Sequence, residues 1–460
     1  GAIGIGFSFF TAPKTIEEAK EIIAHQSSHG DDHATSNDNK THASTEHHDS
    51  KKEAGENHGA HDDKHAEHVF HQLQNKPWAA VYVALFFFLG ISLLVLAFYA
   101  AQRVAQSGWS IVLFRVMEAI TANIIPTSII MLFFIIAGAL HWNHLFSWMA
   151  EGTFDPTSPN YDAIVDGKSW WINVPGWTIR GIVYLLLWNA YRWFIRKNSI
   201  AEDTANDGNK TYKLNYNVSV VFLFIFMLTE SMMSWDWIMG LDPHWFSTLF
   251  GWYVLASLLV SALTVIAFVT IYLRSKNALP GVNDSHIHDL AKFMFGFSVF
   301  WTYLWFAQFM LIWYANIPEE TTYFVARFNE YKLPFLGMVA MNFAFPILLL
   351  INSEFKSIPW FVVIGGIVIL TGHYVDVFIM VMPGTVGAQW SFGLPELGAF
   401  LFFLGIFIYT VFNPFGREYF NFALISQSFK YFNLIIVRES IFERNKPRFD
   451  LLRIDLNNII

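Results

Sequence analysis

Carboxylate and hydroxyl side chains interrupt one long apolar stretch of this sequence, LTESMMSWDWIMGLDPHW. Glu230, Ser234 and Asp236 lie in it, and Glu230 and Ser234 share a helix face because they are four residues apart. Membrane proteins carry protons along such groups together with water, and an ionisable side chain inside a membrane is costly enough to suggest a function. This run therefore predicts a proton path through Glu230 and Asp236. Asp242, followed by Pro243, instead fits the cap of the next helix.

Two further sites could also hold or pass a proton. His373 and Asp376 are three residues apart in LTGHYVDVF, so they share a helix face, and a carboxylate beside an imidazole stabilises the protonated ring. The pair could relay protons near neutral pH, or it could simply form a hydrogen bond between helices. Glu118, with Thr121 one turn later, faces either a bundle interior or the lipid interface.

Histidines decide whether this chain could hold a redox group. The sequence has no cysteine, which excludes thiolate-bound iron–sulfur clusters and c-type haem attached through C-x-x-C-H. A b-type haem needs two facing histidines, and only His141 and His373 lie in predicted spans, so one haem is geometrically conceivable and two are not. Hydrogen bonding is the commoner role for His141. If the chain binds quinol, these two histidines are the candidate partners. We predict no cofactor, metal site or catalytic residue in this chain.

The elements that carry these residues must cross a membrane. Hydrophobic residues make up 54% of the 460 residues, aromatic residues 18% and charged residues only 14%, which lies outside the usual range of soluble domains. A spanning helix needs about 20 apolar residues. The sequence therefore predicts an all-α integral membrane protein with about ten transmembrane helices. The first is a partial helix over 1–12, and the others cover about 78–101, 122–142, 174–195, 216–240, 245–273, 290–315, 333–351, 360–382 and 394–412.

Alternate short loops differ in basic residues, which predicts the orientation. The basic set is Arg103, Arg115, Arg192, Arg196, Lys197, Lys210, Lys213, Arg274, Lys276, Lys292, Lys356 and Arg417, whereas the opposite loops offer only Lys168, Arg180, Arg327 and Lys332. The basic side is expected to be cytoplasmic. Both termini would then be cytoplasmic, and the loops 13–77, 143–172, 316–332 and 383–393 would face outward.

The long outer loop over 13–77 contains eleven of the seventeen histidines and few apolar residues. With so little to bury, it is predicted to be a flexible tether. The alternative is metal buffering, because His61, His65 and His68 would share one face if this stretch became helical.

Several long stretches of this chain resemble the NrfD/polysulfide-reductase-type membrane subunits, and among them the F subunit of bacterial alternative complex III. They are HQLQNKPWAAVYVALFFFLG (71–90), MSWDWIMGLDPHWFSTLFGWYV (233–254), SHIHDLAKFMFGFSVFWTYLWFAQFMLIWYANIPEE (285–320) and PGTVG (383–387). The resemblance covers about 1–412, and it weakens in the tail, 413–460.

The resemblance implies a fold of two four-helix bundles, over 78–241 and 242–382, with the first helix (1–12) and the last (383–412) packed outside. It also implies a bacterial inner-membrane complex in the respiratory chain that oxidises quinol and passes electrons through iron–sulfur and c-type haem subunits to cytochrome c or a terminal oxidase. The sister C subunit is associated with quinol oxidation, whereas the F subunit is regarded as free of cofactors.

For this chain the resemblance implies scaffolding and proton half-channels. Those half-channels would involve Glu118, Glu230, Asp236, His373 and Asp376. Two alternatives stay open: a subunit that binds quinol itself, and a free-standing proton-coupled transporter, since paired bundles with carboxylates near the midplane also occur there.

Overall fold

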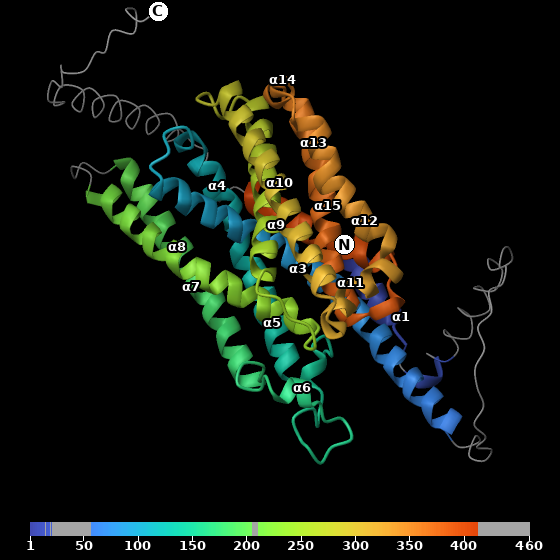
Figure 1. Ribbon diagram of the computed structural model, residues 1–460. Helices are drawn as coiled ribbons and strands as arrows, with labels where there is room; N and C mark the ends of the chain where they lie inside the picture. The colour runs from blue at the N-terminus through green and yellow to red at the C-terminus, as the bar shows by residue number, and fades with distance from the viewer. Residues whose placement is uncertain (14, 19, 21–56, 205–209, 413–460) are drawn as a thin grey trace, which may run out of the picture.

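The computed structural model describes residues 1–13, 15–18, 20, 57–204 and 210–412, and the side chains of residues 57–68 and 204 lie outside this description. Within these ranges the regular structure is helical and contains no strand, which confirms the predicted all-α class (Figure 1). The α-helices are α1 (Ala2–Thr11), α3 (Asn57–Val104), α4 (Phe114–Ile120), α5 (Ile124–Ala139), α6 (Ala163–Asp166), α7 (Val174–Thr204), α8 (Lys210–Trp237), α9 (Phe250–Ser275), α10 (Asp284–Ala315), α11 (Pro318–Asn329), α12 (Lys332–Val339), α13 (Phe345–Leu350), α14 (Ser353–Ser357), α15 (Pro359–Thr385) and α16 (Leu394–Phe412).

In the described part of the chain, eight helical segments are long and apolar enough to cross a membrane. They are Val69–Val104, Ile111–Ala139, Lys210–Leu241, Phe250–Ser275, Asp284–Ala315, Lys332–Leu350, Pro359–Thr385 and Leu394–Phe412. The chain is therefore a multi-pass integral membrane protein. Helix α1 is apolar but only 10 residues long, and the 31-residue α7 carries several arginines. The predicted crossings at these two helices, and thus the count of ten, stay predictions.

Helix α3 lies at the centre of the packing. It contacts α5, α8, α9, α15 and α16, and 94% of its most apolar stretch is buried. It forms one group with α5, α7 and α8, while α9, α10, α12, α13 and α15 pack together as a second group on its other side. The contact between α3 and α9 joins the two groups (Figure 1).

Helices α1 and α16 pack against each other beside this assembly, and α16 also covers α3. Their backbones approach closely where Gly4 meets Gly398, because a Cβ on Gly398 would lie 3.1 Å from the Cα of Gly4. Such contacts between small residues are a common way to pack membrane helices.

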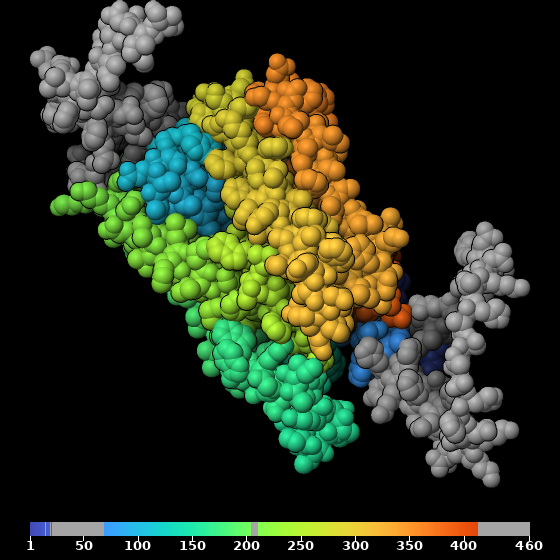
Figure 2. Space-filling view, viewed as in Figure 1, coloured from blue at the N-terminus to red at the C-terminus, as the bar shows by residue number. Residues whose placement is uncertain are grey.

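The two ends of the assembly are easy to distinguish. Helix α6 and the loop around it project at one end, and α14 lies at the opposite end (Figures 1 and 2). Large apolar side chains such as Ile129, Phe224, Leu311 and Leu348 are exposed on the helix surfaces between these ends. They supply the apolar surface that lipid requires.

Two predictions about local structure were wrong. Residues 57–77 are not part of a loop, because α3 begins at Asn57 and continues through Pro77. Low hydrophobicity argues against burial but not against helix, and Ala, Glu, Gln and Lys in this stretch are good helix formers. Asp242 does not cap the next helix, since α9 begins only at Phe250. The proposed tether over 21–56 and the tail over 413–460 lie outside the described residues, as do the side chains of His61, His65 and His68.

Candidate functional site

The carboxylate of Asp376 on α15 lies inside the group formed by α9, α10, α12, α13 and α15. It accepts several hydrogen bonds and pairs with no lysine or arginine among the described residues. Tyr253 donates a hydrogen bond to its Oδ1, while the Ser257 hydroxyl (2.7 Å) and the Trp301 indole N–H (2.9 Å) donate to its Oδ2. The carboxylate is fully buried. Three neutral donors stabilise its ionised form without pairing it with a positive charge.

His373, one turn before Asp376, completes this buried polar cluster. Its Nδ1 lies 3.1 Å from the Ser257 hydroxyl, 3.4 Å from the Asn342 amide and 3.7 Å from Asp376 Oδ2. Two buried atoms of this cluster, His373 Nε2 and Asn342 Oδ1, lack a hydrogen-bond partner among the described residues. We refer to Tyr253, Ser257, Trp301, Asn342, His373 and Asp376 as the His–Asp cluster.

The hydrogen-bond donors around His373 determine which ring nitrogen carries its proton. If Ser257 donates to Asp376 and Asn342 donates to His373 Nδ1, the ring carries its proton on Nε2, which is the unpartnered atom. A second proton on Nδ1 would instead face the Ser257 oxygen and the nearby carboxylate. In this tautomer the ring accepts a proton only at Nδ1, where Asp376 lies close enough to stabilise the charged form. It can then release a proton from Nε2, which is the sequence of steps that a proton relay uses.

A break in regular helix geometry positions Asn342. Residues Ala340–Ala344 form a π-helical turn between α12 and α13. Pro346 has no N–H, so it cannot donate a hydrogen bond to the carbonyl of Asn342 four residues earlier. The wider π-helical turn accommodates this missing hydrogen bond. The turn lies against Gly372, where an added Cβ would come within 2.0 Å of Asn342 Oδ1.

A row of polar side chains on helix α9 forms another side of the His–Asp cluster. Tyr253, Ser257 and Ser261 are four residues apart and all are buried. The Ser261 hydroxyl donates to the carbonyl of Ser257 at 3.0 Å, so it is satisfied within its own helix. Only the first two of the three therefore reach the His–Asp cluster.

Asp236, a predicted proton-path residue, lies in a different environment. Arg180 on α7 contacts both of its carboxylate oxygens at 2.8 Å, and the Tyr184 hydroxyl donates to it at 2.8 Å. The guanidinium also stacks on Trp171, 4.2 Å from the ring centre. This paired geometry resembles a structural link between α7 and α8 more than a site that exchanges protons.

Glu118 lies in a buried ionic network. It accepts hydrogen bonds from Arg115 (2.8 Å), Tyr99 (2.9 Å), Ser199 (2.5 Å) and Arg196. Arg103 contacts the neighbouring Glu202 at 3.1 Å. The network ties α3, α4 and α7 together, and its arginines hold Glu118 in the charged state.

Glu230 differs from the other predicted proton-path carboxylates because one of its oxygens has no hydrogen-bond partner among the described residues. It is 1% exposed, and its Oε1 has no hydrogen-bond partner in the described structure. The Ser234 hydroxyl, on the same helix face, donates to the carbonyl of Ser231 at 2.8 Å. Glu230 is thus a buried carboxyl group without a cation beside it, which favours its neutral, protonated form.

The two histidines proposed as quinol partners lie in different surroundings. His141 is exposed just after α5 and has a positive φ of 58°, whereas His373 is fully buried. Within the described ranges, no hydrogen bond or ring contact joins them. Next to His141, the ring of His144 lies 5.6 Å from that of His71. Among the described residues, no group of three or more His, Cys, Asp or Glu side chains is arranged to hold a metal ion.

Sequence reasoning missed four members of the His–Asp cluster. Tyr253 and Ser257 could have been found from their spacing of four along an apolar helix. Asn342 could have been found from its position four residues before a proline inside a span. Trp301 carries no such signal, because α10 contains several other aromatic residues.

Comparison with models of known protein families and with curated protein sequences gives no match to this chain.

Proposed function

We propose that this chain is an integral membrane, NrfD-like subunit of a quinol-oxidising respiratory complex of the alternative complex III type, and that it scaffolds the complex and conducts protons. The observation that carries the proton role is the His–Asp cluster, in which an unpaired carboxylate stabilises an imidazole with one open nitrogen. Sequence resemblance supports the choice of complex.

In this proposal the redox chemistry belongs to other subunits. Iron–sulfur clusters and c-type haems would be carried by the partner chains, and quinol would be oxidised beside the sister C subunit. Electrons would then pass to cytochrome c or to a terminal oxidase. The complex would lie in the bacterial cytoplasmic membrane, with both termini of this chain cytoplasmic and the His-rich segment periplasmic.

The proton role is tested by substituting Asp376 in the assembled complex. In proteoliposomes, Asp376→Asn should lower the number of protons moved per quinol oxidised, because the neutral amide no longer stabilises a protonated His373. We expect proton transfer through the cluster to slow by about a hundredfold, the lower end of the range for removing one acid–base group. Electron transfer to cytochrome c, measured in the same vesicles, should persist.

Asp284→Asn serves as the matched control, since Asp284 is exposed and pairs with Arg274 at 2.6 Å outside the cluster. Proton movement should be unchanged in this variant. Equal proton-to-electron ratios in wild type and Asp376→Asn would remove the cluster from the proton path.

A second candidate function is quinol binding by this chain. A pocket of about 280 Å³ lies between the end of α1 and the middle of α3, lined in part by Trp78, Asn143 and His144. The Asn143 amide nitrogen is buried and has no hydrogen-bond partner among the described residues. An amide and an imidazole beside an indole are groups that could recognise a quinol ring. Quinone that leaves with this subunit when it is stripped from the complex would favour this function.

A free-standing proton-coupled transporter is the third candidate. It would require the isolated chain to be stable and to move protons in vesicles without any partner subunit. Loss of the chain's stability outside the complex would count against it.

A further inference from the structure

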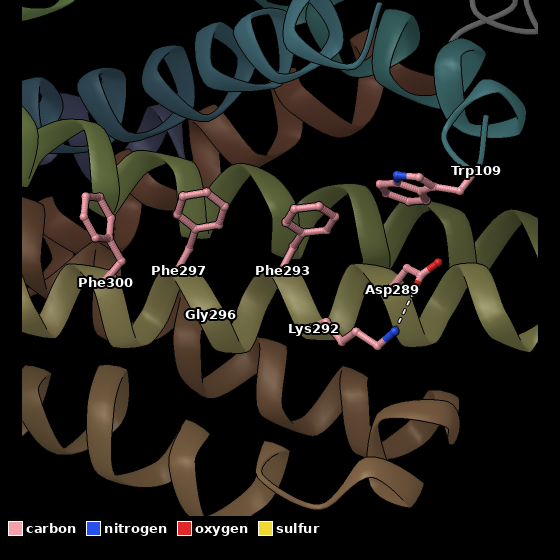
Figure 3. Close-up of a pocket in the computed structure, with 7 residues that line it drawn as sticks. All are labelled: Trp109, Asp289, Lys292, Phe293, Gly296, Phe297 and Phe300. Atoms are coloured by element: carbon pink, nitrogen blue, oxygen red, sulfur yellow. Dashed lines mark hydrogen bonds and ion pairs between the residues drawn. The ribbon is translucent and has the colours of Figure 1, made fainter. Parts of the chain in front are cut away.

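A groove of about 470 Å³ runs along the outside of α10, and this volume lies in the range of small-molecule sites. One wall is aromatic: Phe293 stacks on Trp109 with ring centres 5.5 Å apart and on Phe297 at 6.3 Å. Figure 3 shows Phe293, Phe297 and Phe300 in a row, with Trp109, Asp289 and Lys292 gathered at one end. The groove is thus apolar along its length and charged at one end.

The groove is about as long as the hydrocarbon part of one membrane leaflet is thick. From Asp289 to Phe300 the helix rises about 16 Å. The hydrocarbon core of a bilayer is about 30 Å thick, so the groove extends from the membrane boundary to about its middle. A molecule that fits it is an amphiphile of one leaflet rather than a helix that crosses both.

Two lysines lie near the charged end, Lys292 in the lining of the groove and Lys356 on the neighbouring helix α14. Lys292 contacts Asp289 at 2.9 Å, but the Lys292 side chain is about half exposed, and one carboxylate uses only one of the three ammonium protons. Lys356 on α14 lies over the ring of Phe295 on α10, 4.7 Å from its centre. Burial and then the nearby charge of Lys292 lower the pKa of Lys356, and no ion pair within the described residues involves it.

We propose that this groove binds an anionic phospholipid of the leaflet at the basic end of the protein. The acyl chain lies along Phe293, Gly296 and Phe297, and the phosphate is held by Lys292 and Lys356. Trp109 lies at the boundary between the two, where indole rings are preferred. Basic sites between helices at the cytoplasmic side are a known way to hold anionic head groups.

Charge decides between this occupant and a transmembrane helix of a partner subunit. A partner helix would bury the two lysines against a polypeptide and would need carboxylates at the matching depth. A phosphate supplies the negative charge together with the chain that fills the apolar part. The anionic leaflet also offers it at high local concentration.

The first test compares phosphatidylglycerol with phosphatidylcholine by native mass spectrometry of the full-length chain in detergent. Wild type should retain phosphatidylglycerol more strongly. The double variant Lys292→Gln, Lys356→Gln should lose about fivefold in affinity for each lysine removed, with little change for phosphatidylcholine. Asp289→Asn should tighten phosphatidylglycerol binding, because it removes a negative charge beside the phosphate. This gain cannot arise from misfolding.

The second test fills the groove. An added Cβ at Gly296 meets nothing within 4 Å, so Gly296→Leu should fold normally and occupy the space of the acyl chain. We expect about tenfold weaker binding, the loss expected when about two chain methylenes leave the groove. Gly405→Leu on α16 is the matched control, since its Cβ position is equally open.

Three results would overturn the proposal. Wild type could retain both lipids equally, or Gly296→Leu could bind phosphatidylglycerol as tightly as Gly405→Leu does. Alternatively, Gly296→Leu could release a co-purifying membrane subunit without changing lipid retention, which would make the groove a subunit interface.

Discussion

At the scale of single residues, the buried carboxylates divide by their partners. Asp236 and Glu118 face arginines, whereas Asp376 faces only neutral donors and a histidine. An arginine keeps its proton at all relevant pH values, so a carboxylate paired with it holds helices together. A carboxylate beside a histidine can instead support a group that gains and loses a proton.

Removal of Arg180 tests the structural role of Asp236. Arg180→Gln should lower the free energy of unfolding by about 3–5 kcal/mol, because it leaves a buried carboxylate uncompensated. Adding Asp236→Asn should recover most of this loss, since both charges are then gone. Thermal unfolding in detergent measures both variants. If the double variant is no more stable than Arg180→Gln alone, the uncompensated carboxylate is not the reason for the loss.

Substitution of Gly372 tests the contact that holds Asn342 beside the His–Asp cluster. Gly372→Ala should displace the π-helical turn, because its Cβ would overlap Asn342 Oδ1, and we expect destabilisation of about 1–3 kcal/mol. Gly337→Ala on α12 is the control, because a Cβ there meets nothing within 4 Å. Equal melting temperatures for the two variants would show that the turn moves freely.

At the scale of elements, the sequence predicted the helices better than the contacts between them. The spacing of His373 and Asp376 was enough to pair them on one face of α15. Their partners come from α9, α10 and the π-helical turn, and no pattern within one helix reveals which face of another helix it meets. The early start of α3 was missed because a polar helix that continues an apolar one lacks a hydrophobicity signal.

The short helix α6 shows how a loop outside the membrane is fastened. Asp162 caps it by accepting from the N–H groups of Ile164 (2.9 Å) and Val165 (3.2 Å), and it also contacts His244 at 2.5 Å. Burial raises the pKa of Asp162, but the contact with His244 and the capping hydrogen bonds outweigh it, and the pKa falls below its usual value.

Acid should therefore loosen α6. A carboxylate whose pKa is lowered by folding stabilises the structure above its unfolded pKa of about 3.9, and it loses this contribution as the pH falls through the folded value. We expect an effect of about 1 kcal/mol or less, because His244 is largely exposed. Hydrogen exchange of residues 163–166, corrected for intrinsic rates, should rise in acid for wild type.

The variant Asp162→Asn should remove that acid dependence, since Asn can still cap the helix but does not titrate. Asp166→Asn, in the same helix, should retain it. An acid response of α6 that is identical in wild type and Asp162→Asn would exclude Asp162 as its source.

At the scale of the whole molecule, the two helix groups differ in their polar interiors. The group of α3, α5, α7 and α8 is tied by the arginine pairs of Glu118 and Asp236. Among its described residues, Glu230 and Asp203 each have one carboxyl oxygen without a hydrogen-bond partner. The group of α9, α10, α12, α13 and α15 contains the His–Asp cluster. This division suggests a supporting role for the first group and places the proton chemistry that we propose mainly in the second.

The measurement that tests the central claim most directly is purification from the native membrane under mild conditions. Co-purifying chains are identified, and haem and quinone are quantified before and after this subunit is stripped away. We predict that c-type haem and iron–sulfur subunits accompany the chain and that every cofactor stays behind when it is removed. If the chain purifies alone, or if quinone or haem leaves with it, the proposed division of labour is wrong.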